Sequence, residues 1–572
     1  MLFIMTIIHN SCKKIKKSSK IGVKSLSLND ANLSDIIHNQ SHQSIDCLTQ
    51  IPLYQRRLES FDNIICHIGV GGFFRSHQAI YAHKLLIKSN KTHNGSNEKR
   101  WGFVGIGLMP SDNLMKHVTI QQDCMFTVTA LNSEHTETTI VGSMIDFIYA
   151  PQDESGQTVI ERLANPSTKI VSLTITEKGY CLSVDRKLDL DNNLVKHDLE
   201  NPNTRMHSAV GLIVKALMLR RLRGIDAFTV LSCDNLPGNG ILTKTMVIGF
   251  LDAMCYKYGS GYCGENDTLR KWVTDHVKFP NTMVDRITPV TKPEQVKDDF
   301  SDDIRKFVKE RYGIEDQWPV VAELYSQWII EDNFVNNERP YWELLSGDNV
   351  LIVDDVHCYE MMKIRLLNAG HSALSYVSLL MGYIFVDEAM KDVQIQSFLK
   401  AFLKEQQQSL LPVPGVNITL YKESLIKRFS NPFIKDKLSR LAEDGSNKIL
   451  ITMRDAALSN IHSGKSVKHF CFVLATWIRY LCAFDESGNT ILIKDTSSTK
   501  VEMMIKKSRE ILMVNDAVIP EISIKHSSCR SKIIDFIGTI FGNNLSTCEP
   551  IIAGIIHFLT SICSNNIKYT LS

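Results

Sequence analysis

The sequence lacks long hydrophobic runs, a strong excess of charge of either sign and any cluster of cysteines. Its longest strongly apolar stretches, residues 374–386 and 551–563, are shorter than the ~18 residues that a membrane-spanning helix needs. Its 64 Lys and Arg residues nearly balance its 62 Asp and Glu residues, which leaves a formal charge of +2. So small a charge gives no reason to expect nucleic acid or an anionic membrane as a partner. We therefore expect no membrane span and no nucleic-acid partner.

The 14 cysteines are scattered, with no C-x-x-C pair and no spacing typical of a zinc ribbon. No closely spaced set of Cys and His ligands is evident either, so no metal is expected. Such a pattern is typical of reduced thiols in a cytoplasmic protein. The first 29 residues contain no acid and several lysines, which leaves mitochondrial targeting open beside a disordered tail.

The chain does contain enough material for more than one core, with 572 residues of which 44% are hydrophobic. From residue 63, strand-like and helix-like segments alternate: 63–71, 78–88, 101–108, 169–180 and 227–240. This βαβ order predicts a doubly wound α/β sheet. After residue 354, long apolar segments with helical periodicity predict a mostly α-helical domain.

The stretch CHIGVGGFF, residues 66–74, places two glycines where a dinucleotide-binding turn has them. Gly69 and Gly71 occupy the first two positions, whereas Phe74 stands at the third. Glycines at a strand-to-helix turn let backbone N–H groups approach a pyrophosphate. By itself the pattern supports a cofactor site and a structural turn equally. Asp112, after the next strand-like run, is the candidate acceptor for the ribose hydroxyls.

These observations together predict a disordered tail at residues 1–25 and a Rossmann-like dinucleotide-binding domain at 26–353. A mostly helical substrate and catalytic domain is expected at 354–572.

Three polar residues stand out in an otherwise apolar segment of the helical half, KIRLLNAGH. On an α-helix, Lys363, Asn368 and His371 would lie at about 0°, 140° and 80° around the axis, within one broad sector. A desolvated lysine has a lowered pKa and can act as a general base. The alternative is a lysine that extends to solvent and a histidine that is satisfied inside the core.

Several separated motifs together resemble the polyol-specific long-chain dehydrogenase/reductase family, which includes mannitol 2-dehydrogenase, arabinitol dehydrogenase and hexuronate reductases. They run from about residue 27 to near the C-terminus: HIGVGGFFRSHQA, TITEKGY, VLSCDNLPGNG, FPNTMVDRITPVT, VVAELYSQWIIEDNF, K-x-x-x-x-N-x-x-H and RLAEDGSNK. In that family the first turn reads G-x-G-x-F-x-R-x-H, which is matched here by Gly69, Gly71, Phe73, Arg75 and His77. The family more often has Asn and His where this chain has Gly72 and Phe74, so the choice between NAD and NADP stays open.

The resemblance implies a metal-independent hydride transfer between NAD and a polyol/ketose pair, with D-mannitol and D-fructose as the first expectation. Lys363 would be the general base, Asn235 and Asn368 would stabilise the oxyanion, His371 would bind a substrate hydroxyl and Glu177 would control the proton path to solvent. The expected polyol-site residues are Asp285, Arg440 and Lys448, and the expected cofactor contacts are Gly69, Gly71, Phe73, Arg75 and Asp112.

Three alternatives stay open. A hexuronate such as fructuronate or mannonate carries a carboxylate, which Arg440 and Lys448 could bind. An arabinitol dehydrogenase belongs to the same resemblance, and a protein that kept the fold but lost catalysis would bind nucleotide only. In each case we expect a small-molecule ligand and a monomer or weak homo-oligomer.

Overall fold

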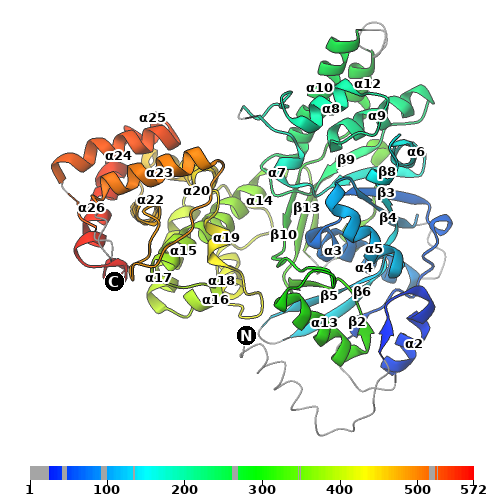
Figure 1. The fold of residues 1–572 in the computed structure, drawn as a ribbon, viewed down its shortest axis with the longest axis horizontal. Helices are drawn as coiled ribbons and strands as arrows, with labels where there is room; N and C mark the ends of the chain where they lie inside the picture. Colours follow the sequence, from blue (N-terminus) through cyan, green and yellow to red (C-terminus); the bar gives the residue numbers. More distant parts are fainter. Residues whose placement is uncertain are drawn as a thin grey trace. The chain divides into compact units, whose positions relative to one another are not determined.

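The computed structural model describes residues 25–41, 48–91, 99–132, 135–183, 185–259, 268–345, 347, 349–514, 522–524 and 526–571. The chain forms two compact units, Met1–Val356 and His357–Ser572 (Figure 1). Of the tail expected at residues 1–25, all but the last residue lies outside the described part.

A five-stranded parallel sheet lies at the centre of the N-terminal unit, in the order β7-β4-β3-β8-β9. Its strands are β3 (Asn63–Ile68), β4 (Trp101–Gly107), β7 (Met144–Tyr149), β8 (Thr168–Leu173) and β9 (Thr229–Ser232). From β3 the chain continues to β4 on one side and later returns to β8 on the other side. The crevice at such a reversal of strand order is where open α/β sheets bind ligands.

Both faces of this sheet are covered, which explains why β3 and β4 are largely apolar and are buried along their whole length. Because side chains alternate along a strand, Ile64 and Cys66 enter one hydrophobic core and Ile65 enters a second. The first core includes residues of α9 (Ala209–Leu222) and α10 (Asn239–Tyr258).

Three further sheets and several helices complete this unit. A four-stranded sheet has the order β12-β5-β6-β2, a three-stranded sheet the order β10-β13-β14, and β1 pairs with β11. The strands are β1 (Leu26–Ser27), β2 (Leu48–Gln50), β5 (Phe126–Leu131), β6 (Thr136–Val141), β10 (Thr282–Asp285), β11 (Ile314–Glu315), β12 (Val320–Glu323), β13 (Gln327–Glu331) and β14 (Val350–Val353). The helices not yet named are α2 (Asp30–Ser41), α3 (Gly72–Ser76), α4 (Gln78–Lys91), α5 (Asn113–Gln121), α6 (Gln157–Ala164), α7 (Thr176–Gly179), α8 (Asn193–Glu200), α12 (Thr268–His276) and α13 (Asp299–Tyr312).

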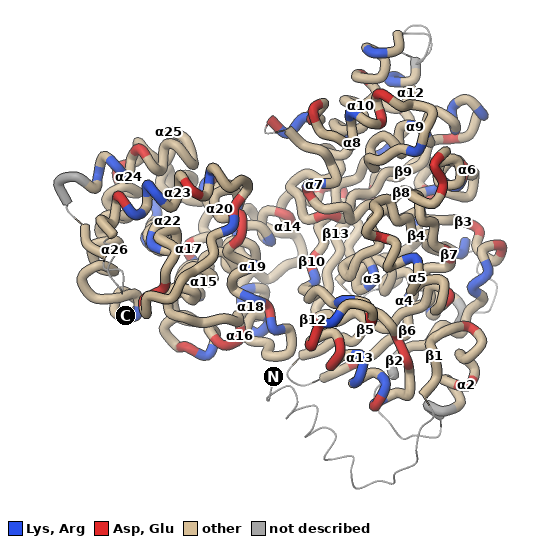
Figure 2. Tube along the Cα trace, viewed as in Figure 1, with Lys and Arg blue, Asp and Glu red and all other residues tan. Residues whose placement is uncertain are grey.

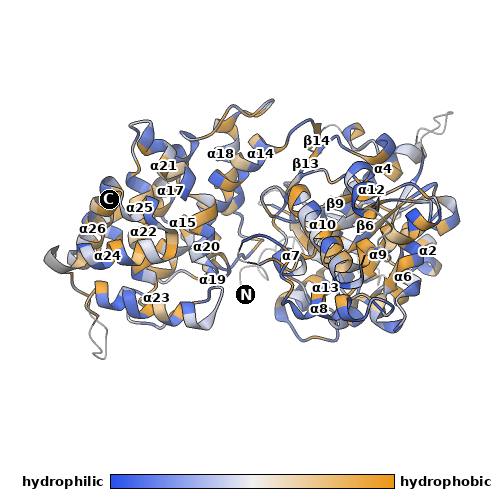
Figure 3. Ribbon diagram, turned by 90° about the horizontal axis from the view of Figure 1, so that it is seen from above, coloured by the Kyte–Doolittle hydropathy of each residue, from blue (hydrophilic) through white to orange (hydrophobic). Residues whose placement is uncertain are grey.

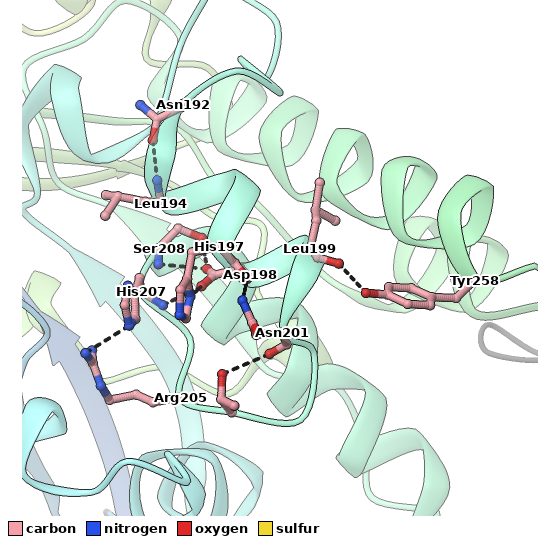
Figure 4. Close-up of polar contacts among 12 residues, drawn as sticks. Asn192, Leu194, His197, Asp198, Leu199, Asn201, Arg205, His207, Ser208 and Tyr258 are labelled. Carbon is pink, nitrogen blue, oxygen red and sulfur yellow. Dashed lines mark hydrogen bonds and ion pairs between the residues drawn. The ribbon is translucent and has the colours of Figure 1, made fainter.

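The connection between α8 and α9 is fixed by one buried carboxylate. Asp198 accepts hydrogen bonds from the backbone N–H groups of His207 (2.6 Å) and Ser208 (2.8 Å) and from the Ser208 hydroxyl (2.6 Å). The Ser208 hydroxyl in turn caps α9, and the rings of His197 and His207 stack 3.5 Å apart (Figure 4).

The C-terminal unit is helical, built around α15 and α22. Its segments are α14 (His357–Met362), η7 (Lys363–Asn368), α15 (Ala369–Leu380), α16 (Val386–Ala389), α17 (Val393–Gln407), α18 (Ile418–Phe429), α19 (Leu438–Ala442), α20 (Gly445–Thr452), α21 (Arg454–His462), α22 (Lys468–Tyr480), α23 (Ser498–Ile511), α24 (His526–Phe541), α25 (Asn543–Ser546), α26 (Glu549–Ser564) and α27 (Ile567–Leu571). Every residue of α22 from Phe470 onward is buried. The fold class predicted from the sequence, a Rossmann-like sheet domain and a mostly helical domain, is confirmed.

Side chains are distributed as in ordinary globular domains. Lys and Arg are interspersed with Asp and Glu along both units (Figure 2), and hydrophobic and hydrophilic residues alternate around the helices (Figure 3). Within the described part, no helix has the length and hydrophobicity to cross a membrane. Among the cysteines that the structure describes, ten have free thiols, but Cys255 in α10 is disulfide-bonded. The expectation of reduced thiols throughout is wrong at this position, since spacing alone does not reveal which cysteines the fold brings together.

Candidate functional site

The turn after β3 has one glycine that is required by packing and one that faces open space. Gly69 has φ +97°, and a Cβ there would lie 2.2 Å from the Thr174 carbonyl oxygen. At Gly71, which precedes α3, a Cβ would meet nothing closer than the Gly69 oxygen at 4.0 Å. The first glycine thus permits the turn to pass close to the end of β8, and the second leaves backbone accessible. This is the arrangement that a dinucleotide-binding turn needs.

Hydrogen bonds hold this turn against β8. The Thr174 hydroxyl donates to the Gly69 carbonyl (2.8 Å), and the His67 ring lies between Thr174 (Nε2 to Oγ1, 2.8 Å) and Ser172 (Nδ1 to Oγ, 2.8 Å). Burial lowers the pKa of His67 to about 3, so the ring is neutral. Because the Thr174 proton goes to Gly69, Nε2 of His67 carries the ring proton and Nδ1 accepts from Ser172.

Phe74, which breaks the three-glycine pattern, is fully buried beside the turn. Its ring stacks on His67 with centroids 3.9 Å apart and contacts the edge of Phe103 at 5.1 Å. It therefore fills the space between α3 and the sheet, where a glycine would allow a closer helix. The turn keeps its shape without the third glycine because aromatic packing sets the helix position.

The other motif residues of α3 are engaged inside the fold. Arg75 is 2% exposed; its guanidinium donates to the Trp318 carbonyl (2.6 Å) and lies over the rings of Phe126 and Trp318. Burial lowers the pKa of Arg75 to about 10. The Phe73 ring stacks on His77 at 4.9 Å, and the His77 ring bonds through Nε2 to the Gln327 carbonyl (2.9 Å). Cofactor contact by Phe73 and Arg75 stays a prediction, and the contacts of Arg75 favour support of α3 instead.

Asp112 follows the next strand, as expected for a ribose acceptor. It ends a short 3-10 helix (Pro110–Asp112) directly after β4, and its Oδ2 accepts a hydrogen bond from the Met109 N–H (2.9 Å). Partial burial raises the pKa of this carboxyl. Since β4 is the neighbour of β3, Asp112 lies at the same edge of the sheet as the glycine turn.

Two predicted catalytic residues follow β8 and β9, which are adjacent parallel strands. Glu177 lies in α7 and is exposed, and Asn235 follows β9 and is also exposed. The carboxyl ends of parallel strands meet at one edge of a sheet, so the structure brings Gly69, Glu177 and Asn235 to the same edge. Asp285 is buried at the end of β10.

The loop that carries Asn235 is fixed by residues that the sequence reasoning missed. The Asn239 side chain donates to the carbonyls of Asp234 (3.0 Å) and Thr282 (3.0 Å) and accepts from the Thr282 N–H (2.9 Å). Asp234 is buried, and its carboxylate accepts hydrogen bonds from the backbone N–H groups of Ile175 and Thr176, just before Glu177. Both residues stand in the motif VLSCDNLPGNG, where the polar residues in the loop after a buried strand were the available signal.

The polar triplet of the C-terminal unit lies on a helix that is not α-helical throughout. Residues Lys363–Asn368 form a π-helical turn, η7, between α14 and α15. Its i→i+5 hydrogen bonds widen the turn. The angle around the helix axis between Lys363 and Asn368 is therefore smaller than the 140° expected for an α-helix. The α-helical spacing assumed from the sequence is therefore wrong here. Lys363 is 5% exposed, and π-turns of this kind occur frequently at functional sites.

His371 and the two expected cationic residues lie on neighbouring helices of the same unit. The His371 ring in α15 stacks on Phe429, with centroids 4.2 Å apart. The helix α20, which carries Lys448, packs against η7 and α15. It approaches closely because Gly445 has no side chain: a Cβ there would lie 2.7 Å from atoms of Tyr376 and Trp477.

Arg440 and Lys448 differ in their surroundings. Arg440, with a side chain that is 58% exposed, forms a two-pronged ion pair with Asp436 in which Nε lies 2.8 Å from Oδ1. Lys448 donates to the Leu441 carbonyl (3.0 Å), and burial, followed by the charge of Arg440, lowers its pKa. Their common role in substrate binding stays a prediction.

No group of three or more His, Cys, Asp and Glu side chains in the described ranges is arranged to hold a metal ion.

Comparisons with known proteins cover both units. The model of the mannitol dehydrogenase Rossmann domain matches residues 63–344, and that of the mannitol dehydrogenase C-terminal domain matches residues 355–523. Mannitol dehydrogenase 2 of Saccharomyces cerevisiae is 36% identical over 501 residues, 86% of this chain and 93% of that protein. D-mannonate oxidoreductase of Escherichia coli is 37% identical over 442 residues, 77% of this chain and 83% of that protein. The structure of Pseudomonas fluorescens mannitol 2-dehydrogenase, a ternary complex with NAD and D-mannitol, is 34% identical with a TM-score of 0.75, covering 96% of this chain and 99% of that chain.

Proposed function

The chain belongs to the mannitol dehydrogenase family, and we propose that it is an NAD-dependent oxidoreductase that acts on the secondary alcohol of a polyol. D-mannitol and D-fructose are the first substrate pair. The observation that carries this proposal is the edge of the five-stranded sheet, where an open glycine turn, Glu177 and Asn235 follow β3, β8 and β9. The domain at residues 26–353 would bind NAD, and that at 354–572 would supply the base.

The residues of the glycine turn fit the cofactor. The accessible backbone at Gly71 would meet the pyrophosphate, and the Asp112 carboxylate would accept from the ribose hydroxyls. A carboxylate at that place favours NAD over NADP, because it would repel a 2′-phosphate. When bound, NAD would supply the acceptor for the hydride that leaves the alcohol carbon.

The protein's own groups would handle the proton and the charge. Lys363, as a neutral amine, would take the hydroxyl proton at Nζ, which its burial favours. The side-chain N–H groups of Asn235 and Asn368 would donate to the alcohol oxygen as negative charge develops, a contribution of about 2.7–4 kcal/mol for each such donor in other enzymes. His371 would hold a substrate hydroxyl, and the exposed Glu177 would exchange the proton with solvent.

The state of Arg440 bears on the choice between polyol and hexuronate. The E. coli relative is named a D-mannonate oxidoreductase, so a hexuronate is the second candidate. A substrate carboxylate would have to compete with Asp436 for the Arg440 guanidinium, because that pair is already bidentate. Neutral hydroxyls do not require this exchange, which supports the polyol. Asp285 and Lys448 would complete the polyol contacts.

The test measures the rate of change of nicotinamide absorbance when the purified protein acts on D-mannitol, D-arabinitol or D-mannonate, each with NAD and with NADP. We expect the highest kcat/KM with D-mannitol and NAD. The variant Asp436→Asn, which frees Arg440, is expected to raise kcat/KM for D-mannonate relative to that for D-mannitol. A wild-type protein that prefers D-mannonate would overturn the substrate assignment but not the reaction type.

A cytoplasmic compartment and a monomer or weak homo-oligomer stay predictions; ten of the described cysteines have free thiols, which fits a reducing compartment, whereas the disulfide at Cys255 does not. Cell fractionation tests the compartment against the mitochondrial alternative, and light scattering tests the assembly.

A further inference from the structure

A single buried carboxylate contacts both ends of the short helix that carries Glu177. Asp234 Oδ2 accepts from the Ile175 N–H (2.9 Å) and Oδ1 accepts from the Thr176 N–H (2.9 Å), at the start of α7. Oδ2 also accepts from the hydroxyl of Tyr180 (2.7 Å), which directly follows α7. Asp234 is itself the residue before Asn235. It therefore joins the segments that hold the proposed proton gate and one proposed oxyanion donor.

We propose that Asp234 is a positioning residue, which holds Glu177 and Asn235 in register with each other for the hydride-transfer reaction. This role rests on the proposed function, because it acts through residues assigned there.

The contacts demand an ionised carboxylate and not merely a polar side chain. All three partners donate, and an asparagine would place an NH₂ group against at least one of these donors. The Tyr180 hydroxyl is buried, and burial together with the charge of Asp234 raises its pKa far above the usual value, so it remains a donor. The Ser232 hydroxyl, 2.6 Å away, then donates to the Tyr180 oxygen.

The backbone at this place needs such a restraint. Thr176 has φ +60°, a left-handed conformation that a β-branched residue rarely adopts. Its N–H is one of the two that bond to Asp234. Without the carboxylate this turn would relax, and Glu177 in the next position would move with it.

The experiment compares Asp234→Asn with a matched control in the same unit. Asp198→Asn removes another buried carboxylate that also accepts from two backbone N–H groups and a hydroxyl, and that lies 3.2 Å from His197 Nδ1. It lies in the α8–α9 connection, which holds no predicted site residue (Figure 4). Both variants are measured for kcat and for the KM of NAD with D-mannitol, alone and combined with Glu177→Gln.

For Asp234→Asn we expect kcat to fall by about 10- to 100-fold with the KM for NAD nearly unchanged, because misplacement by about 1 Å has effects of this size. In the Glu177→Gln background the same substitution is expected to cost far less, since the residue it positions is already disabled. Asp198→Asn should change kcat little, and any effect should be the same in both backgrounds.

Equal effects of Asp234→Asn and Asp198→Asn, or full additivity with Glu177→Gln, would overturn the positioning role. Should Asp234→Asn fail to fold, Tyr180→Phe provides the test, because it removes only one of the three donors to the carboxylate. A several-fold loss of kcat in Tyr180→Phe supports the positioning role, and an unchanged kcat overturns it. A wild-type protein inactive on every substrate would instead overturn the proposed function, and the positioning role with it.

Discussion

Replacement of Gly71 by alanine separates cofactor binding from folding. The added Cβ would meet no atom within 4 Å apart from the Gly69 oxygen, and φ −100° with ψ −173° is extended backbone that alanine adopts without strain. Alanine also restricts the unfolded chain, so the free energy of unfolding should stay constant or rise by about 0.4–1 kcal/mol. Folding should therefore be unharmed.

Binding of NAD should nevertheless weaken. If the pyrophosphate approaches the backbone at Gly71, a methyl group there keeps it away and breaks at least one N–H bond to a charged oxygen, a loss of about 1.5–3 kcal/mol. That corresponds to a Kd raised by about 10- to 100-fold. Isothermal titration calorimetry with NAD measures the Kd, and thermal unfolding without NAD measures stability.

The neighbouring variant Gly69→Ala gives the opposite pattern. Here the Cβ would lie 2.2 Å from the Thr174 oxygen at φ +97°, so the variant should lose stability, by more than the ~1–3 kcal/mol of backbone strain alone. A well-folded Gly71→Ala that binds NAD as tightly as the wild type would refute the assignment of this turn to the pyrophosphate.

Three other outcomes are expected. Lys363→Ala should lower kcat by about 10²- to 10⁴-fold while NAD still binds, as measured by stopped-flow absorbance and calorimetry; near-normal turnover would rule it out as the base. Burial lowers the pKa of His67 to about 3, so the unfolded chain binds more protons than the folded chain between about pH 6.5 and pH 3. The free energy of unfolding should therefore fall as the pH falls through this window, by up to ~1.4 kcal/mol per pH unit. Urea unfolding between pH 7 and pH 4.5 should show that the free energy of unfolding falls less steeply with pH in His67→Gln than in the wild type. The same slope in both proteins would mean that this ring does not titrate as described. Prolonged dialysis against EDTA should leave turnover with D-mannitol intact, and activity lost and then restored by zinc would contradict a lysine-based mechanism.

The alternation of strand and helix patterns was sufficient to predict the sheet domain, since apolar strands buried on both faces differ plainly from amphipathic helices. The ion pair of Arg440 with Asp436 could not be derived from helical spacing, because Asp436 lies before α19, which begins at Leu438. The role of Asp234 could not be predicted either, since its partners lie 54 to 59 residues earlier in the chain and meet it only when β8 pairs with β9. The interior position of Arg75 was hidden for the same reason: it bonds to Trp318, far along the sequence.

The π-turn at Lys363–Asn368 makes the winding of this helix as important as its composition. If the same residues formed a regular α-helical turn, Asn368 would lie about 140° around the axis from Lys363, and the two side chains would point to different faces. Loss of one residue between them would leave the lysine and the asparagine four positions apart, about 40° around a continuous α-helix and again on one face. The extra residue and the wide turn thus offset each other, so an alignment of this segment must allow a one-residue gap between the lysine and the asparagine.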